Sequence, residues 1–361
     1  MASSTFCSHL WNYFIYDVTK DRLKGCCKTN WQAFGDYDSD WNHLVLARQE
    51  MQGGGRPQIC QLCWQMEDQG LQSFRVQQKR TDSHEYTDQF SLKPQTLEIV
   101  LEKTCDLKCV YCGPQFSSRW QQHLNVPVEK FSFSEESQAR FQKRIESFWG
   151  SLYRINFIGG EPLLQDSFYR IIETLLQIPS GSRKKFRIVT NLNARSQLVD
   201  RFISLINQYS HHHFEICVSN EAVGDLAMKV REGLNFERFD LNVNRLLLET
   251  SPQNQIYFLT TLNLMNLEGL PEFLRYTLRK SADHQRDIHL IWNAVTSPEP
   301  LSPYQNPQML KRVVHESQTI LQEQIHNQQE RAALSKNLQE YVSRLESMLT
   351  PTPSARLASE K

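Results

Sequence analysis

The stretch TLEIVLEKTCDLKCVYC occupies residues 96–112 and joins a short apolar run to three closely spaced cysteines. The apolar run, at 97–101, is rich in branched aliphatic side chains and short, which is typical of a buried strand. Cys105, Cys109 and Cys112 follow it directly. In parallel α/β folds the reacting groups stand at the carboxyl ends of the strands, so the sequence predicts a functional site here.

Five further apolar runs of the same kind follow, separated by segments in which apolar residues recur at helical spacing. They occupy residues 154–158, 185–189, 214–219, 255–260 and 287–292. Strands that alternate with helices predict a parallel sheet, because parallel neighbours need long connections. The predicted fold class is therefore α/β. Six units are fewer than the eight of a closed barrel, so both a partial (β/α)6 barrel and a doubly wound sheet fit, and we expect the partial barrel.

Two of the connecting segments show clear signs of helices. At 134–149 the apolar residues fall on one stripe, and Ser134 is the expected N-cap because two glutamates follow it. At 163–177 a second apolar stripe predicts a helix with Asp166 or Ser167 as its cap.

Composition divides the chain into four parts. Residues 1–95 carry five of the nine cysteines and little clean periodicity, so we expect a small Cys-rich module stapled by metal. Residues 96–300 contain the six predicted strands. Residues 301–350 are rich in glutamine and predict a helical hairpin, and residues 351–361 are expected to form a disordered tail.

The bulk properties limit the partners and the compartment. The 361 residues include 40 basic and 40 acidic side chains, and this balance argues against a general nucleic-acid binder. No stretch approaches the roughly 18 apolar residues that span a bilayer, and the first residues lack a secretory signal pattern. We therefore expect a cytoplasmic protein with no membrane partner. In that reducing compartment, clustered cysteines are more often metal ligands or redox groups than disulfides.

Three cysteines on one loop have a specific chemical meaning. Thiolates are the standard ligands of iron–sulfur clusters, and three of them leave one iron of a [4Fe–4S] cluster open to a substrate. A structural zinc site is the first alternative, although it commonly uses paired CxxC elements, and only Cys109 and Cys112 have that spacing. Chance clustering of buried cysteines is the second.

The CxxxCxxC pattern, with Tyr111 just before its third cysteine, resembles the signature of the radical S-adenosylmethionine superfamily. The resemblance implies that the open iron chelates the amino and carboxylate groups of S-adenosylmethionine and that Tyr111 lies near the adenine. Gly159, Gly160 and Glu161 end the second predicted strand and resemble the GGE motif of that family, whose backbone holds the methionyl amine. The resemblance thus implies reductive cleavage of S-adenosylmethionine and hydrogen abstraction from a substrate by the resulting radical.

Polar residues also stand at the ends of later strands. Small polar side chains there are expected to hydrogen-bond the cofactor, with ordinary helix capping as the alternative. Arg231 resembles an arginine that contacts the cofactor carboxylate or the substrate in related enzymes, and a solvated helix charge is its alternative. Asn293, at the end of the sixth strand, is expected to contact the substrate. The expected cofactor contacts are Thr190, Asn191, Ser219 and Glu221.

The N-terminal cysteines suggest a second metal site. Cys60 and Cys63 form a CxxC pair, and Cys7 with one of Cys26 or Cys27 would complete four ligands for an auxiliary iron–sulfur cluster or for zinc. Their arrangement resembles the N-terminal part of radical S-adenosylmethionine proteins with a twitch-type auxiliary domain, although leucine precedes Trp11 where proline is common. The resemblance covers most of the chain up to about residue 298. The other matching positions are Glu67, Gly70, Ser73 and Arg75, of which Glu67 and Arg75 are expected to form an ion pair.

The resemblance also implies the partners. A flavodoxin- or ferredoxin-like protein would supply the electron. Relatives with auxiliary clusters modify peptides and proteins, or oxidise small sugars and aminocyclitols, and we expect a peptide or protein substrate with the small molecules as the alternative. A non-catalytic iron–sulfur or zinc scaffold protein is the alternative of another class. The sequence does not indicate an oligomeric state.

Overall fold

A computed structural model of the chain describes residues 5–29, 42–68, 70, 73–79, 88, 90–91, 93–128, 131–179, 181–327 and 332–349. Its centre is an eight-stranded sheet in the order β10-β9-β7-β6-β5-β3-β1-β2. All neighbouring strands are parallel except β2, which is antiparallel to β1. The strands are β1 (Tyr13–Asp17), β2 (Arg22–Gly25), β3 (Thr96–Val100), β5 (Arg154–Ile158), β6 (Lys185–Thr190), β7 (His213–Ser219), β9 (Gln255–Leu262) and β10 (Ile288–Ala294).

The α/β fold with a parallel sheet is confirmed, and each of the six predicted strands is present. The sheet is open, with β2 and β10 at its two edges. From β3 to β10 the strands lie side by side in chain order, whereas a doubly wound sheet reverses its order at a switch point. The doubly wound alternative is therefore wrong for this part of the sheet.

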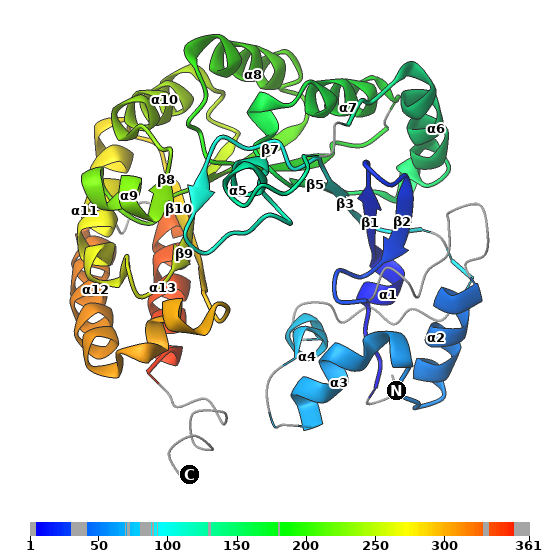
Figure 1. Cartoon of the computed structure of the whole chain (residues 1–361), viewed down its shortest axis with the longest axis horizontal. Helices are drawn as coiled ribbons and strands as arrows, with labels where there is room; N and C mark the ends of the chain where they lie inside the picture. The colour runs from blue at the N-terminus through cyan, green and yellow to red at the C-terminus, as the bar shows by residue number, and fades with distance from the viewer. Residues whose placement is uncertain are drawn as a thin grey trace.

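The helices that connect the strands follow the outer side of an arc, with the sheet on its inner side (Figure 1). Strand residues that point outward, such as Phe157 and Phe258, pack in T-shaped or tilted contacts against Phe168 and Phe273 of these helices. The apolar core thus lies between sheet and helices. The connecting helices are α6 (Glu135–Glu146), α7 (Asp166–Gln177), α8 (Ser196–Gln208), α9 (Gly224–Val230), α10 (Phe236–Glu249) and α11 (Leu270–Asp283).

The predicted helix caps had different outcomes. Ser134 is the N-cap of α6, and its hydroxyl accepts a hydrogen bond from the Ser137 N–H, as predicted. The cap predicted for α7 is wrong, because Asp166 is already the first helical residue and Gln165 precedes it without a side-chain cap bond. A 3-10 turn at Pro162–Leu164 occupies the residues in front, so the helix begins later than its apolar stripe suggested.

The Cys-rich part of the chain contributes β1 and β2 to the central sheet, where β1 pairs with β3. Its helices lie at one end of the arc (Figure 1). These are α1 (His9–Asn12), α2 (Asn42–Gln52), α3 (Gln61–Asp68) and α4 (Phe74–Lys79), with the 3-10 turn η2 (Gln58–Cys60) before α3. Two strands from this segment were not predicted.

At the other end of the arc, α12 (Pro307–Asn327) packs against α13 (Ala332–Ser347), which lies beside β10 (Figure 1). The Asn337 amide donates to the Leu290 carbonyl at 3.1 Å and accepts from the Leu290 N–H at 2.8 Å. This side chain therefore satisfies backbone groups on the exposed edge of the sheet, which would otherwise be able to pair with another strand. The tail predicted at 351–361 lies outside the described residues.

Within the described ranges, no helix combines the length and the apolar character that a membrane span requires.

Candidate functional site

The three cysteines after β3 lie on one loop, and the loop is anchored at its centre. Cys109 belongs to the short strand β4 (Lys108–Cys109), which pairs antiparallel with β8 (Arg231–Glu232) so that Cys109 is opposite Arg231. Cys109 is buried, whereas Cys105 and Cys112 are partly exposed. The middle cysteine of the loop is thus enclosed by protein, whereas the first and the third are accessible from outside.

Polar residues following the loop fold it into a fixed shape. The Cys105 N–H donates to the Ser118 hydroxyl at 3.1 Å, and the Ser117 hydroxyl donates to the Leu107 carbonyl at 2.7 Å. The Trp120 indole donates to the Cys109 carbonyl at 2.9 Å. These bonds satisfy backbone groups in and before β4 that have no partner within a helix or sheet.

Glu221, Arg231 and Tyr111 form one buried group beside Cys109. Arg231 Nη2 lies 2.6 Å from Glu221 Oε2, and the two side chains are 4% and 0% exposed. The Tyr111 hydroxyl donates to Glu221 at 3.0 Å, and the Arg231 guanidinium lies 5.6 Å from the Tyr111 ring centre. Burial alone would lower the Arg231 pKa, but the adjacent Glu221 carboxylate outweighs it and raises that pKa. Arg231 is thus permanently charged, and its guanidinium is occupied by protein groups.

Glu161, predicted from the GGE motif, is buried and joins the ends of two strands. Its carboxylate accepts from the Thr190 hydroxyl at 2.5 Å, from the Asn191 N–H at 2.6 Å and from the Leu163 N–H at 3.2 Å. Burial raises its pKa to about 7, although these hydrogen bonds act in the opposite direction. The side chain therefore ties the glycine turn to the end of β6.

The two glycines before Glu161 are required by close backbone packing. A Cβ atom on Gly160 would lie 2.3 Å from the Thr104 carbonyl oxygen, just before Cys105. Gly159 has a φ of +143°, and a Cβ there would lie 2.9 Å from that of Leu101. The glycine turn thus packs directly on the segment that leads into the cysteine loop, whereas the backbone approach predicted from the motif was to a ligand.

Asn191 connects this turn to the cysteines. Its amide donates to Asp106 Oδ1 at 2.9 Å and lies 3.9 Å from the Cys105 sulfur. Asn193 donates to the other Asp106 oxygen at 2.6 Å and to the Gly233 carbonyl at 3.1 Å. Sequence reasoning missed Asp106 and Asn193. Two sequence features could have identified them: the Asn-x-Asn spacing after β6 for Asn193, and the position of Asp106 inside the cysteine loop.

Ser219 and Asn293 lie near the ends of their strands, as predicted. They take no part in the hydrogen bonds described above for Glu161, Asn191 and Arg231. Ser219 is the last residue of β7 and is half-buried, and Asn293 lies near the end of β10 with an exposed side chain. The structure thus assembles Tyr111, Glu161, Thr190, Asn191, Glu221 and Arg231 around the cysteine loop and leaves these two at the rim.

Four of the N-terminal cysteines form a second buried group. Cys60 ends η2, Cys63 lies in α3, and Cys7 and Cys26 approach them from the chain around β1 and β2. Cys7 interacts electrostatically with Cys26, Cys60 and Cys63. Burial raises the pKa of Cys7 to about 11 and raises that of Cys60 further. The thiols of Cys7 and Cys60 are therefore protonated near neutral pH.

Cys27 differs from Cys26 in its surroundings. Cys26 is buried, has a left-handed φ of +65° and interacts with Cys7. Cys27 is half-buried; its thiol shares a hydrogen bond with that of Cys26, and Glu98 and Lys28 lie near it. Cys26 is thus the more buried of the two and lies beside Cys7.

Beside this group, the predicted ion pair between Glu67 and Arg75 is confirmed. Arg75 Nε donates to Glu67 Oε1 at 2.9 Å, and Ser73 donates to the same oxygen at 2.5 Å. Arg75 also donates to the Phe6 carbonyl at 3.1 Å, next to Cys7. The ion pair thus holds the backbone next to Cys7 in place through the Phe6 carbonyl.

Both groups consist of thiols, and thiolates are the usual ligands of iron–sulfur clusters and of structural zinc. All nine cysteines are free thiols, and seven of them fall into the two groups. Among the described residues, no three Cys, His, Asp or Glu side chains are close enough to hold a single metal ion. A tetrahedral zinc would require sulfurs about 3.8 Å apart, given Zn–S bonds of about 2.3 Å. Ligands of a cluster stand farther apart, because each binds a different iron.

Comparison with protein-family models and with curated proteins finds no match to this chain, so the site is interpreted from its own geometry.

Proposed function

We propose that the chain is a radical S-adenosylmethionine enzyme that takes a hydrogen atom from a peptide or protein substrate. Cys105, Cys109 and Cys112 would hold a [4Fe–4S] cluster. When bound, the cluster and S-adenosylmethionine supply an organic radical by one-electron cleavage of the sulfonium. The observation that carries the proposal is the packing of the glycine turn, Glu161 and Asn191 directly on this cysteine loop.

The chain's own residues would position the cofactor and exclude water. The turn at Gly159 and Gly160 packs on the segment that leads into the cysteine loop, which would fix the backbone polar groups at the end of β5 for an amino acid ligand. Tyr111, fixed by Glu221 and Arg231, offers an aromatic edge beside Cys109 for a flat base. Asn191 would orient the loop at Cys105, and Arg231 would orient it at Cys109.

The open sheet is best understood as a partial (β/α)6 barrel. The strands from β3 to β10 follow chain order, and the connecting helices lie on one side. The other face of these strands carries a polar row: Glu98, Asn156, Arg187, Glu215 and Gln255 lie side by side across neighbouring strands. A packed core would be apolar there, so this face suits a substrate-containing interior.

Cys7, Cys26, Cys60 and Cys63 would hold the auxiliary cluster. It would accept the electron left on the substrate after hydrogen abstraction or transfer electrons inward, and zinc remains the alternative metal. A flavodoxin- or ferredoxin-like donor would supply the first electron in a reducing cytoplasm. The second candidate function is oxidation or epimerisation of a sugar or aminocyclitol. A non-catalytic scaffold would have no use for the glycine turn beside the cysteines.

The test is formation of 5′-deoxyadenosine by protein that is reconstituted with iron and sulfide without oxygen and given dithionite and S-adenosylmethionine. The wild type is expected to form it, and the combined Cys105→Ala, Cys109→Ala and Cys112→Ala variant is not. Cys217→Ala is the matched control, because Cys217 is buried in β7 and belongs to neither group. Equal formation by the wild type and the triple variant would overturn the proposal.

A further inference from the structure

On the inner face of the sheet, the basic side chains around Glu215 outnumber the carboxylate that pairs with them. Arg154, Lys185 and Arg187, from two neighbouring strands, all lie within 3.3 Å of the Glu215 carboxylate. Glu215 is almost fully buried, and although burial alone would raise its pKa, the three cations lower it. One carboxylate therefore faces three cations, which leaves two positive charges for another partner.

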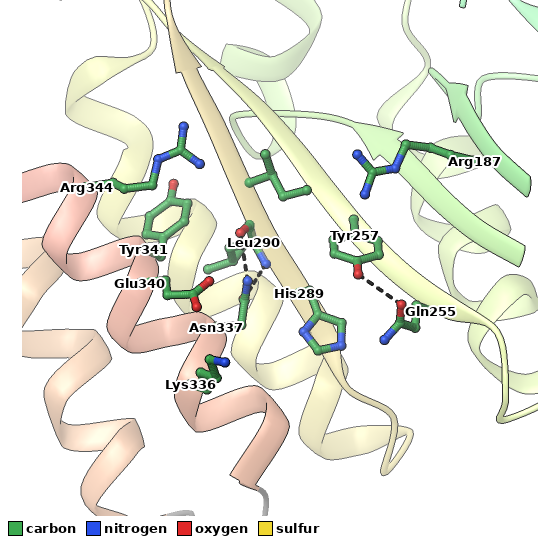
Figure 2. Close-up of a pocket in the computed structure, with 11 residues that line it drawn as sticks. Arg187, Gln255, Tyr257, His289, Leu290, Lys336, Asn337, Glu340, Tyr341 and Arg344 are labelled. Carbon is green, nitrogen blue, oxygen red and sulfur yellow. Dashed lines mark hydrogen bonds between the residues drawn. The ribbon is translucent and has the colours of Figure 1, made fainter. Parts of the chain in front are cut away.

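A cavity of about 640 Å³ opens beside these charges, between the sheet and α13 (Figure 2). Its sheet side includes Arg187, Tyr257 and His289, and the two rings lie 5.1 Å apart. Its helix side includes Lys336, Glu340 and Arg344, spaced four residues apart along one stripe. Arg187 and Arg344 flank the cavity from opposite sides (Figure 2).

A second cavity of about 310 Å³ shares Gln255 with the first and is lined by Arg183 and Lys185. Glu340 is the one acidic residue among those that line the two cavities. The combined surface therefore favours an anion, and an aminocyclitol, which is a cation near neutral pH, would be repelled from it.

The position of the cavities indicates an extended ligand. Lys185 begins β6, whereas Thr190 ends the same strand and contacts Glu161 beside the cysteine loop. Five steps along a strand measure about 17 Å, at about 3.3 Å per residue. A sugar cannot fill the cavities at the amino ends of the strands and also reach the reacting end, but a peptide can.

We propose that these two cavities bind an acidic segment of the peptide substrate, through Arg187 and Lys185 on the sheet and Lys336 and Arg344 on α13. The inference rests on the proposed function and specifies its substrate further, as a peptide with an acidic segment. Carboxylates of the segment replace the counterions that the excess cations otherwise attract, while a neighbouring part of the same peptide lies at the carboxyl ends of the strands.

The experiment measures binding of a fluorescein-labelled peptide of alternating glutamate and glycine to the full chain by fluorescence anisotropy, with a glutamine-glycine peptide for comparison. The combined Lys336→Gln and Arg344→Gln variant is expected to bind the acidic peptide about tenfold more weakly, and Glu340→Gln about threefold more tightly. A gain of affinity cannot result from unfolding. Arg312→Gln, an exposed charge on α12 outside both cavities, should bind as the wild type does.

Equal binding of the two peptides, or unchanged affinity in all three variants, would overturn the inference. This assay needs neither cluster nor S-adenosylmethionine, so its outcome is separate from that of the proposed function. Peptide binding without 5′-deoxyadenosine formation would contradict only the enzyme proposal, and 5′-deoxyadenosine formation without charge-dependent peptide binding would contradict only the inference.

Discussion

Cys109 lies opposite Arg231 in a two-stranded sheet, and Arg231 Nη1 is 3.9 Å from the Cys109 sulfur. The central thiol of the cysteine loop is thereby attached to the segment that follows α9. Arg231 is itself held by Glu221, just past the end of β7. Protein groups thus occupy the Arg231 guanidinium and join it to the cysteine loop.

Arg231→Gln is expected to lower the free energy of unfolding by roughly 3–5 kcal/mol, because it leaves the fully buried Glu221 carboxylate without its cation. Chemical denaturation would measure this. Adding Glu221→Gln to the same chain should restore much of the loss, because no buried charge then remains. The exposed Arg312→Gln should change stability by less than about 0.5 kcal/mol. Equal losses in the single and double variants would contradict the charge argument.

The distinct surroundings of Cys26 and Cys27 predict different effects on the auxiliary metal. After reconstitution without oxygen, Cys26→Ala is expected to lose about four irons per chain, whereas Cys27→Ala should retain them. Iron and sulfide analysis would measure the difference, with Cys217→Ala as the control for loss of a buried thiol. Loss of iron in Cys27→Ala alone would show that the left-handed residue is not the ligand.

Glu161 predicts a dependence of stability on pH. Its pKa is about 7 in the folded chain and near 4.5 in the unfolded one, so the folded state binds the extra proton between these values. Stability should therefore fall as pH rises from about 4.5 to 7 and level off above, by about 3 kcal/mol in total. Glu161→Gln cannot titrate, so the unfolding free energy of the wild type minus that of the variant should fall by about 3 kcal/mol over that range. A constant difference would contradict the raised pKa.

The sequence was sufficient to predict the strands and helices whose apolar residues recur at a regular spacing. The runs that became β3, β5, β6 and β9 alternate buried outward residues with half-buried inward ones, as Leu97 and Glu98 illustrate. The hairpin β1–β2 was missed because Tyr13–Asp17 is mostly buried and lies among cysteines and aromatic residues that mask its alternation. The two-residue strands β4 and β8 exist only as a tertiary pairing, so no local pattern could predict them.

For the candidate site, motif spacing identified the cysteines, the glycine turn and Glu161, but not their connections. The bonds of Asn193 to Asp106 and of Arg231 to Glu221 join residues far apart in the chain, or side chains whose directions depend on the fold. The role expected for Arg231 at the cofactor came from resemblance, whereas its burial could be seen only in three dimensions.

The most direct test of the central claim is electron paramagnetic resonance of the reduced, oxygen-free, reconstituted protein before and after addition of S-adenosylmethionine. If the cluster at Cys105, Cys109 and Cys112 has an iron open to the cofactor, the signal should change on addition, and the change should be absent in the triple alanine variant. A signal that is identical with and without S-adenosylmethionine in the wild type would contradict the account.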